Sequence, residues 1–170
     1  MFFSNISYLN TYVSDPEIVS CTESQSQNNY PCEEAFDGIL DGDGNGWAYE
    51  AAISVSPAWV IFELDKKTKL TSLKLLSGIG GNDHRLITFK ATMKVNEKWV
   101  VPSALTVEED SEDLIGNDGT ITLNSGIHVV TLGFNPIANV MSIRLEVTKT
   151  DNASKNNLRL TEIIPNFLKE

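Results

Sequence analysis

The chain has 170 residues, 41% of them hydrophobic, and a formal net charge of −10 at pH 7. A chain of this length buries roughly 70% of the surface that it exposes when unfolded, so we predict that residues 1–170 form a single domain. No apolar run approaches the roughly 20 residues that a membrane-spanning helix needs.

The charge is unevenly distributed. Residues 1–50 contain nine acidic side chains and no lysine or arginine. Such a surface repels phosphates, which excludes nucleic acid as a partner and argues against anionic membrane lipid. The first residues lack the basic start and long apolar run of a signal peptide, so secretion cannot be read from this sequence.

The first strand is expected around 18–20, and the two cysteines of the chain, Cys21 and Cys32, follow it. They have no histidine nearby, which makes a zinc site improbable. Two interpretations remain open. An oxidised pair would pin the intervening loop onto the next element, whereas two buried free thiols would not.

Residues 31–38 predict one short helical turn, with Pro31 at its first position and Gly38 at its exit. A loop follows in which acidic and amide side chains alternate with glycines, which places hard oxygen ligands on backbone that bends sharply. These residues predict a structural calcium site with side-chain ligands at Asp37, Asp41, Asp43 and Asn45. An EF-hand fits less well, because Ala52 stands where a glutamate is needed, and a turn that binds no ion is a further alternative.

From residue 58 onward, short alternating or β-branched segments follow one another with almost no helical pattern. Asp65–Lys67 is expected to form a turn, and Asn96-Glu97 a tight hairpin connection. This pattern predicts an all-β fold, an antiparallel β-sandwich or jelly roll. The expected strands are 58–64, 70–76, 86–95, 98–101, 120–123, 128–134, 141–148 and 158–164.

The order of these signals resembles the coagulation factor V/VIII C-type domain, also called the discoidin domain, and the related galactose-binding-like carbohydrate-binding modules. The resemblance covers about residues 15–165. The matching stretches are Ala35-Phe36-Asp37-Gly38 followed by Trp47, Trp59 to Leu64, Ile87 to Lys90 with Trp99, and Ser142 to Leu145 followed by Leu158 to Ile163.

The resemblance implies a jelly roll with a structural calcium ion that is held by Asp37, by the loop before Trp47 including Leu40, and by Glu162 of the last strand. A sandwich whose last strand lies beside the first makes Asp37 and Glu162 neighbours. The alternative is that Glu162 faces solvent.

On such a scaffold, ligands are bound by loops at one end of the sandwich. Sugars need planar amide, guanidinium or imidazole groups for their hydroxyls and an aromatic face for the ring. Trp47 is expected in the core and Arg144 between strands. The candidate ligand contacts are therefore Asn28, Tyr30, Tyr49, Asn82, His84, Arg85, Asn152 and Asn156.

No motif for catalysis is apparent, since the two histidines, His84 and His128, have no marked nucleophile or carboxylate partner. The sequence therefore predicts a non-catalytic, calcium-stabilised module that binds a glycan or glycoprotein and serves adhesion or targeting of a larger extracellular or cell-surface protein. The alternative is a protein–protein adhesion or assembly domain of the same fold.

Overall fold

The computed structural model describes residues 15–26, 30–40, 46–49, 56–78, 84–108, 114–126, 128–151 and 158–168. Every strand pairing in this part of the chain is antiparallel, as the sequence predicted. No helix in the described ranges is long and apolar enough to cross a bilayer. The elements are β1 (Ile18–Glu23), η1 (Cys32–Ala35), β2 (Trp47–Tyr49), β3 (Ala58–Ser77), β4 (Leu86–Val95), β5 (Lys98–Val100), β6 (Thr106–Glu108), β7 (Leu114–Ile115), β8 (Thr120–Thr122), β9 (Val129–Thr150) and β10 (Leu158–Phe167).

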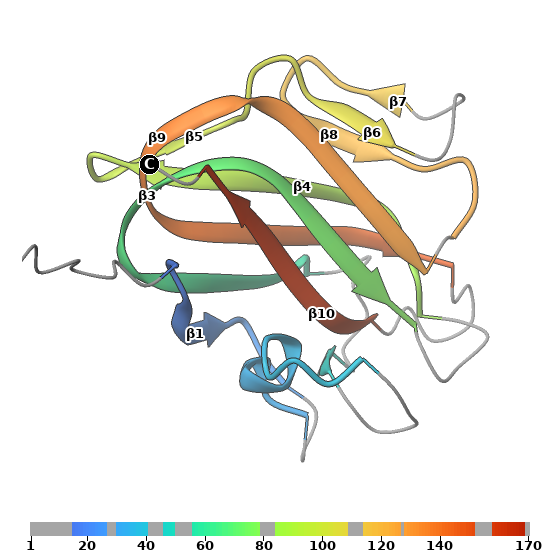
Figure 1. Ribbon diagram of the computed structural model, residues 1–170. Coiled ribbons are helices and arrows are strands. Elements are labelled where there is room, and N and C mark those ends of the chain that lie inside the picture. The colour runs from blue at the N-terminus through green and yellow to red at the C-terminus, as the bar shows by residue number, and fades with distance from the viewer. Residues whose placement is uncertain are drawn as a thin grey trace, which may run out of the picture.

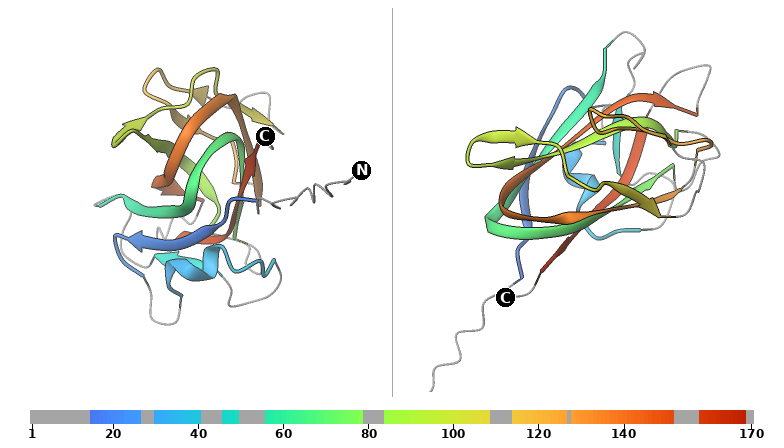
Figure 2. Two further views of the ribbon diagram at one scale, coloured as in Figure 1. Left: turned by 60° about the vertical axis from the view of Figure 1, so that its left-hand side comes forward. Right: turned by 90° about the horizontal axis from the view of Figure 1, so that it is seen from above.

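Two long strands, β3 and β9, run through both layers of the sandwich (Figure 1). The first part of β3 pairs with residues 142–147 of β9, and its last part pairs with residues 129–133. Between these parts the register shifts repeatedly, and such irregularities bend a strand. The bends allow the sheet to fold over on itself (Figure 2).

Because β3 and β9 bend without ending, two predictions about where strands end are wrong. The turn expected at Asp65–Lys67 is wrong, because β3 continues through it as a strand. The separate strands expected at 128–134 and 141–148 are likewise one strand, β9. The polar residues that suggested turns lie where the strands bend, at partly or fully exposed positions, and the strands keep their partners on both sides of the bend.

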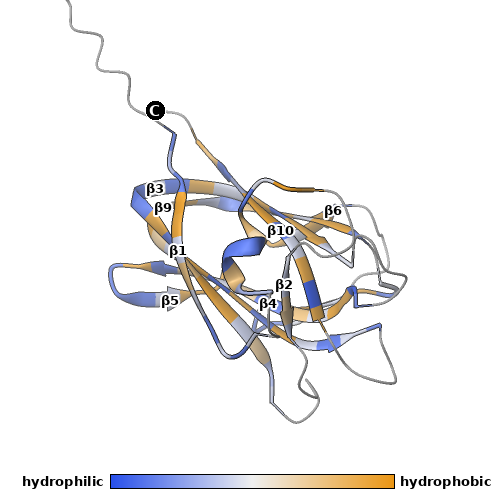
Figure 3. Ribbon diagram, turned by 90° about the horizontal axis from the view of Figure 1, so that it is seen from below, coloured by the Kyte–Doolittle hydropathy of each residue, from blue (hydrophilic) through white to orange (hydrophobic). Residues whose placement is uncertain are grey.

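The core lies between the layers and follows the alternation of the strands, which is visible as alternating colours in Figure 3. Val60 and Phe62 of β3 are fully buried, and the Phe62 ring meets Phe36 edge-on at 6.0 Å between centroids. Trp47 is also fully buried, and its indole Nε1 donates to the Gln25 carbonyl at 3.1 Å. The expectation that Trp47 belongs to the core is confirmed.

A disulfide of 2.06 Å joins Cys21 of β1 to Cys32 of η1, so the alternative of two free thiols is wrong. The predicted helical turn is a single 3-10 turn, with Pro31 just before its first residue. It lies between β1 and β10 (Figure 3) and leads into Gly38, which has a φ of 80°. The disulfide therefore fixes the turn from which the acidic loop departs.

The two ends of the sandwich differ. At one end, which we call the loop end, β3 stops at Ser77, β4 starts at Leu86, β9 stops at Thr150 and β10 starts at Leu158. Leu86 pairs with Thr150, and its N–H donates to the Ser77 hydroxyl at 3.2 Å. The opposite end carries the predicted β4–β5 hairpin, whose turn residues 96 and 97 both have positive φ, as a tight hairpin turn requires.

Candidate functional site

Asp37 and Glu162 come together from distant parts of the sequence. Glu162 lies on β10, and Asp37 follows η1, which packs beside β10. The Glu162 side chain is only 5% exposed, so the alternative that it faces solvent is wrong. The Gly38 N–H donates to the carboxylate, but its Oε2 atom is buried without a partner among the described residues.

The electrostatics of this pair are unfavourable as they stand. The pKa of Glu162 is raised from 4.5 to about 7, mainly by burial; the Gly38 hydrogen bond lowers it and the negative charge of Asp37 adds to the rise. A buried acceptor without a partner and a like charge beside it both cost free energy. A bound cation would remove both costs.

Local backbone structure fixes the two ends of the acidic loop. Asp37 Oδ1 accepts the N–H of Ile39 at 2.8 Å, which closes a tight turn. At the other end, a Cβ on Gly46 would lie 2.4 Å from the carbonyl oxygen of Leu160 on β10, so only glycine fits there. The loop therefore leaves from beside Glu162 and returns to β10 two residues before it.

The donor set fits calcium, which prefers several oxygen ligands including carboxylates and backbone carbonyls. Asp37 and Glu162 would supply the carboxylates. Leu40 is 49% exposed, and the role of its carbonyl stays a prediction. The remaining predicted ligands, Asp41, Asp43 and Asn45, lie outside the described residues.

A cavity of about 300 Å³ opens next to this pair, between the start of β1 and the end of β10. Its walls combine apolar side chains with polar groups, among them the buried carboxyl group of Glu162. The lining residues are Pro16, Glu17, Ile18, Phe36, Glu162, Ile163, Ile164, Pro165 and Phe167.

The loop end brings together an aromatic ring, a guanidinium and a histidine from three separate segments. The Arg159 guanidinium lies over the Tyr30 ring, 4.9 Å from its centroid. The Arg159 N–H donates to the carbonyl of His84 at 3.3 Å. His84 has a φ of 87°, an uncommon value for a non-glycine residue that occurs more often at functional sites.

Tyr30 and His84 were predicted as ligand contacts, whereas Arg159 was missed. Its neighbours Leu158 and Leu160 are buried, so the alternation of β10 alone places Arg159 on the outer face. That signal was available in the sequence. What the sequence could not supply is the position of Tyr30 beside it.

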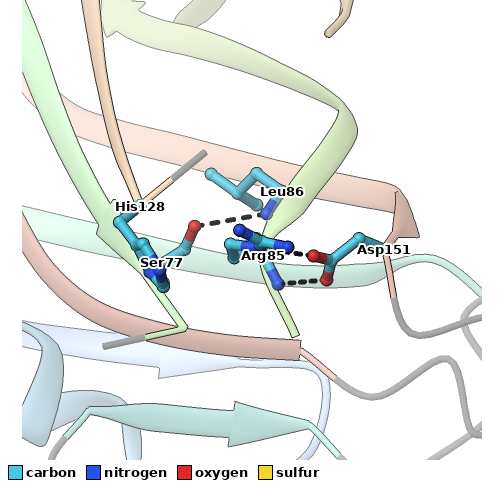
Figure 4. Close-up of polar contacts among 5 residues, drawn as sticks. All are labelled: Ser77, Arg85, Leu86, His128 and Asp151. Atoms are coloured by element: carbon cyan, nitrogen blue, oxygen red, sulfur yellow. Dashed lines mark hydrogen bonds and ion pairs between the residues drawn. The ribbon is translucent and has the colours of Figure 1, made fainter. Parts of the chain in front are cut away.

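Arg85, another predicted contact, is engaged within the protein (Figure 4). Its Nε donates to Asp151 Oδ2 at 2.5 Å, its backbone N–H donates to Asp151 Oδ1 at 2.7 Å, and the Asp151 N–H donates to the Arg85 carbonyl at 3.1 Å. The side chains are 29% and 15% exposed. This pair clamps the start of β4 to the end of β9, and Asp151 was not singled out from the sequence.

The other predicted contacts are not all described. Tyr49 is 3% exposed, and its hydroxyl donates to the Ser56 carbonyl at 3.3 Å, so its ring is part of the core. Burial favours a structural role for Tyr49. Asn28, Asn82, Asn152 and Asn156 lie outside the described residues.

His128 lies near a serine without forming a catalytic arrangement. Its Nδ1 contacts the backbone carbonyl of Ser77 at 3.1 Å, and the Ser77 hydroxyl accepts the Leu86 N–H (Figure 4). A base that activates a nucleophile must instead reach the hydroxyl. The non-catalytic assignment of the chain stays a prediction.

A jelly-roll sandwich with its candidate contacts at one end defines a class of binding modules that use strand-connecting loops. Residues 19–161 match the F5/8 type C domain family, so the chain belongs to this family. No match was found among curated proteins.

The fold is also similar to solved carbohydrate-binding structures. A pectin-binding carbohydrate binding module is 19% identical, with 89% of this chain and 92% of that chain covered and a TM-score of 0.63. The lectin binding domain of Lectinolysin, as a His 62 mutant complexed with Lewis b, is 16% identical, with 89% of this chain and 92% of that chain covered and a TM-score of 0.65. The family 32 carbohydrate-binding module of C. perfringens NanJ, in complex with galactose, is 15% identical, with 88% of this chain and 97% of that chain covered and a TM-score of 0.62. At these identities the likeness establishes the jelly-roll fold.

Proposed function

We propose that the chain is a non-catalytic carbohydrate-binding module that recognises glycans with its loop end. The observation that carries this proposal is the convergence of Tyr30, His84 and Arg159 there. An aromatic ring offers a face for the apolar side of a sugar, and guanidinium and imidazole groups bond its hydroxyls. Similar structures that contain pectin-binding modules, galactose or Lewis b support the same class of ligand.

Three of the remaining predicted contacts fall in the sequence between strands whose ends form the loop end. The connection 79–83 joins the end of β3 to the start of β4, and 152–157 joins β9 to β10. Asn82, Asn152 and Asn156 therefore belong to segments whose bases frame Arg159 and the Arg85–Asp151 clamp. Their amides would supply the paired donor and acceptor that vicinal hydroxyls need.

We further infer that a calcium ion between Asp37 and Glu162 stabilises the module. The buried Oε2 of Glu162 without a partner and the adjacent Asp37 support this inference. The Leu40 carbonyl and the side chains of Asp41, Asp43 and Asn45 would complete the oxygen shell. The ion would join η1 to the last strand and have no part in binding sugar directly.

The test of glycan binding is an array of immobilised glycans probed with the purified protein. We expect binding to specific glycans that free monosaccharide competes away, with at least a tenfold loss in Tyr30→Ala and in Asn82→Ala. The matched control is Trp99→Ala, which removes an aromatic ring that is 39% exposed at the opposite end and should leave binding unchanged. Equal binding by the wild type and the three variants would contradict the proposal that the loop end binds the glycan.

The setting proposed for the module is an extracellular or cell-surface protein, in which it serves adhesion or targeting. The Cys21–Cys32 disulfide supports this, because disulfides persist mainly in oxidising compartments. Alkylation of the native protein before and after reduction measures the state of the pair. We expect both cysteines to be blocked before reduction, and free thiols in the native protein would contradict this location.

A second candidate function is polypeptide binding at the cavity between β1 and β10. Two large apolar side chains near this cavity are more than 40% exposed. Val19 lies on β1, whose first residue lines the cavity, and Ile39 follows Asp37 by two residues. A protein complex that survives gel filtration, that is lost in Ile18→Asp and that occurs without any glycan signal would favour this function. A glycan signal that Ile18→Asp leaves unchanged would favour the loop end.

A further inference from the structure

Arg159 differs from the other arginine of the loop end in its partners. The Arg85 guanidinium is bound by Asp151, whereas none of the ion pairs found among the described residues involves Arg159. Its guanidinium contacts the Tyr30 ring instead. The loop end therefore presents one guanidinium whose charge no described carboxylate neutralises.

The backbone fixes both members of this stack. Arg159 pairs with Ala48 of β2, and Ala48 donates its N–H to the Tyr30 carbonyl at 3.2 Å. Tyr30 and Arg159 thus flank Ala48, whose methyl side chain leaves room for the arginine to cross to the ring. The Arg159 carbonyl accepts the Gly78 N–H at 3.0 Å, which ties the same residue to the end of β3.

A guanidinium stacked on an aromatic ring has lost much of its rotational freedom but keeps the donors in its plane. Those donors match the two oxygens of a carboxylate, with which arginine forms paired, charge-assisted hydrogen bonds. Tyr30 keeps its ring beside the same group, where the apolar face of a pyranose could pack against its exposed part. A sugar ring that carries a carboxylate therefore matches the chemistry of both groups of the stack.

We propose that the loop end takes a carboxylated sugar, with Arg159 receiving the carboxylate and Tyr30 holding Arg159 in position. This inference rests on the proposed function and adds the class of sugar. It makes Arg159 a specificity-determining residue of the site.

The charge of the protein favours a single paired contact over general attraction to polyanions. The net charge is −10, and the first lysine of the sequence is Lys66. A densely sulfated polymer depends on clustered basic side chains and is repelled by such a protein. One carboxylate bound by one fixed guanidinium gains two short hydrogen bonds and needs no basic cluster.

The experiment is titration calorimetry of the full chain in calcium-containing buffer with trigalacturonic acid and with its neutral methyl ester. We expect the acid to bind at least tenfold more tightly, because hydrogen bonds to charged groups are worth about a factor of 10 to 100. Arg159→Gln should bring the two affinities together, and Arg159→Lys should retain only a small preference. Tyr30→Phe keeps the stack and should retain the preference, whereas Tyr30→Leu should reduce it.

Two further ligands identify the source of the carboxylate and its specificity. An Arg159-dependent preference for 3′-sialyllactose over lactose would support the proposal with a sialic acid in place of a uronic acid. Heparin tests general attraction to anions, and binding as tight as that of the acidic sugar would overturn the proposal.

The outcomes separate this inference from the function on which it rests. Binding of neutral glycans with no preference for acid over ester would overturn the carboxylate inference alone and leave the proposed function intact. Absence of binding to every glycan on the array would overturn both. Melting temperatures show whether Arg159→Gln is folded, and if it is not, Tyr30→Leu decides the result.

Discussion

Two pairs of side chains join segments that are distant in the sequence, and they differ in their charges and hydrogen bonds. Arg85 and Asp151 combine opposite charges with three hydrogen bonds, so their charges and donors are satisfied by each other. Asp37 and Glu162 combine like charges with a buried oxygen that has no described partner. The first pair is complete within the protein, whereas we propose that a cation completes the second. Stability should therefore depend on calcium at one pair and not at the other.

The largest effect is expected from Gly46→Ala, which acts on the Asp37–Glu162 side. The new Cβ would collide with the Leu160 carbonyl, and Gly46 has a φ of 102°, so we expect a loss of about 3–5 kcal/mol or failure to fold. Urea denaturation measures the loss. The matched control is Gly38→Ala, which has a similarly positive φ but no atom within 4 Å and should cost about 1–2 kcal/mol. Equal losses would show that contact with β10 is unimportant.

Removal of the disulfide should have the next largest effect. For a separation of 11 residues, the double variant Cys21→Ser/Cys32→Ser should lose about 3 kcal/mol, measured by denaturation of oxidised wild type and variant. Because the disulfide holds η1, the variant should also bind calcium more weakly. Wild type under reducing conditions is the control and should behave like the variant. An unchanged calcium affinity would show that Asp37 is positioned without the disulfide.

Breaking the Arg85–Asp151 clamp should have an intermediate effect that calcium does not alter. Asp151→Asn removes the charge and one of the acceptors, and we expect a loss of about 1–2 kcal/mol in denaturation experiments with calcium or with chelator. The surface pair of Lys94 and Glu97 at the opposite end, with side chains 31% and 87% exposed, is the control, and Glu97→Gln should leave the unfolding midpoint unchanged. A calcium-dependent loss in Asp151→Asn would remove the contrast between the two pairs.

The pH dependence of the calcium-free protein should show an effect no larger than that of breaking the clamp. The pKa of Glu162 rises from an ordinary value of 4.5 to about 7 on folding, so the folded state binds more protons than the unfolded state between these values. This contribution to stability is present below pH 4.5 and is lost as the pH rises through 7. Between pH 5.5 and 8 the loss should be about 1–2 kcal/mol.

Glu162→Gln is the control for this prediction, since it has no proton to lose and should flatten the dependence. The measurement is the unfolding free energy in chelator across this pH range. Calcium should reverse the trend for the wild type, because the ion binds the ionised carboxylates. The contradicting result is an equal change in the two proteins. If the unfolding free energy of the calcium-free wild type rose from pH 5.5 to 8 by as much as that of Glu162→Gln, Glu162 would not have the buried environment described here.

The fold could be predicted largely from local pattern. Alternation placed the strands, and the Asn96-Glu97 connection produced the expected hairpin. The pattern failed at Asp65–Lys67, because polar residues are typical both of a turn and of an exposed bend in a long strand. Only the pairing of β3 with β9 on both sides of the bend distinguishes the two.

The site could be predicted only in part, because its contacts join segments far apart in the sequence. The family resemblance placed Glu162 beside Asp37, which periodicity alone does not do. Neither the stack of Arg159 on Tyr30 nor the clamp of Arg85 by Asp151 could be found in this way, since each depends on how two segments distant in the sequence meet. The cysteine spacing allowed a disulfide or free thiols, and the positions of η1 and β1 decide between them.

The central claim, that a cation completes the Asp37–Glu162 pair, is tested most directly by melting temperatures in calcium and in chelator. At a free calcium concentration about 100 times the dissociation constant, the wild type should gain about 2.7 kcal/mol, or roughly 5–10 °C. Asp151→Asn should show the same gain, whereas Asp37→Asn and Glu162→Gln should lose it. A wild type that melts at the same temperature in calcium and in chelator, or a full gain in Glu162→Gln, would contradict the claim.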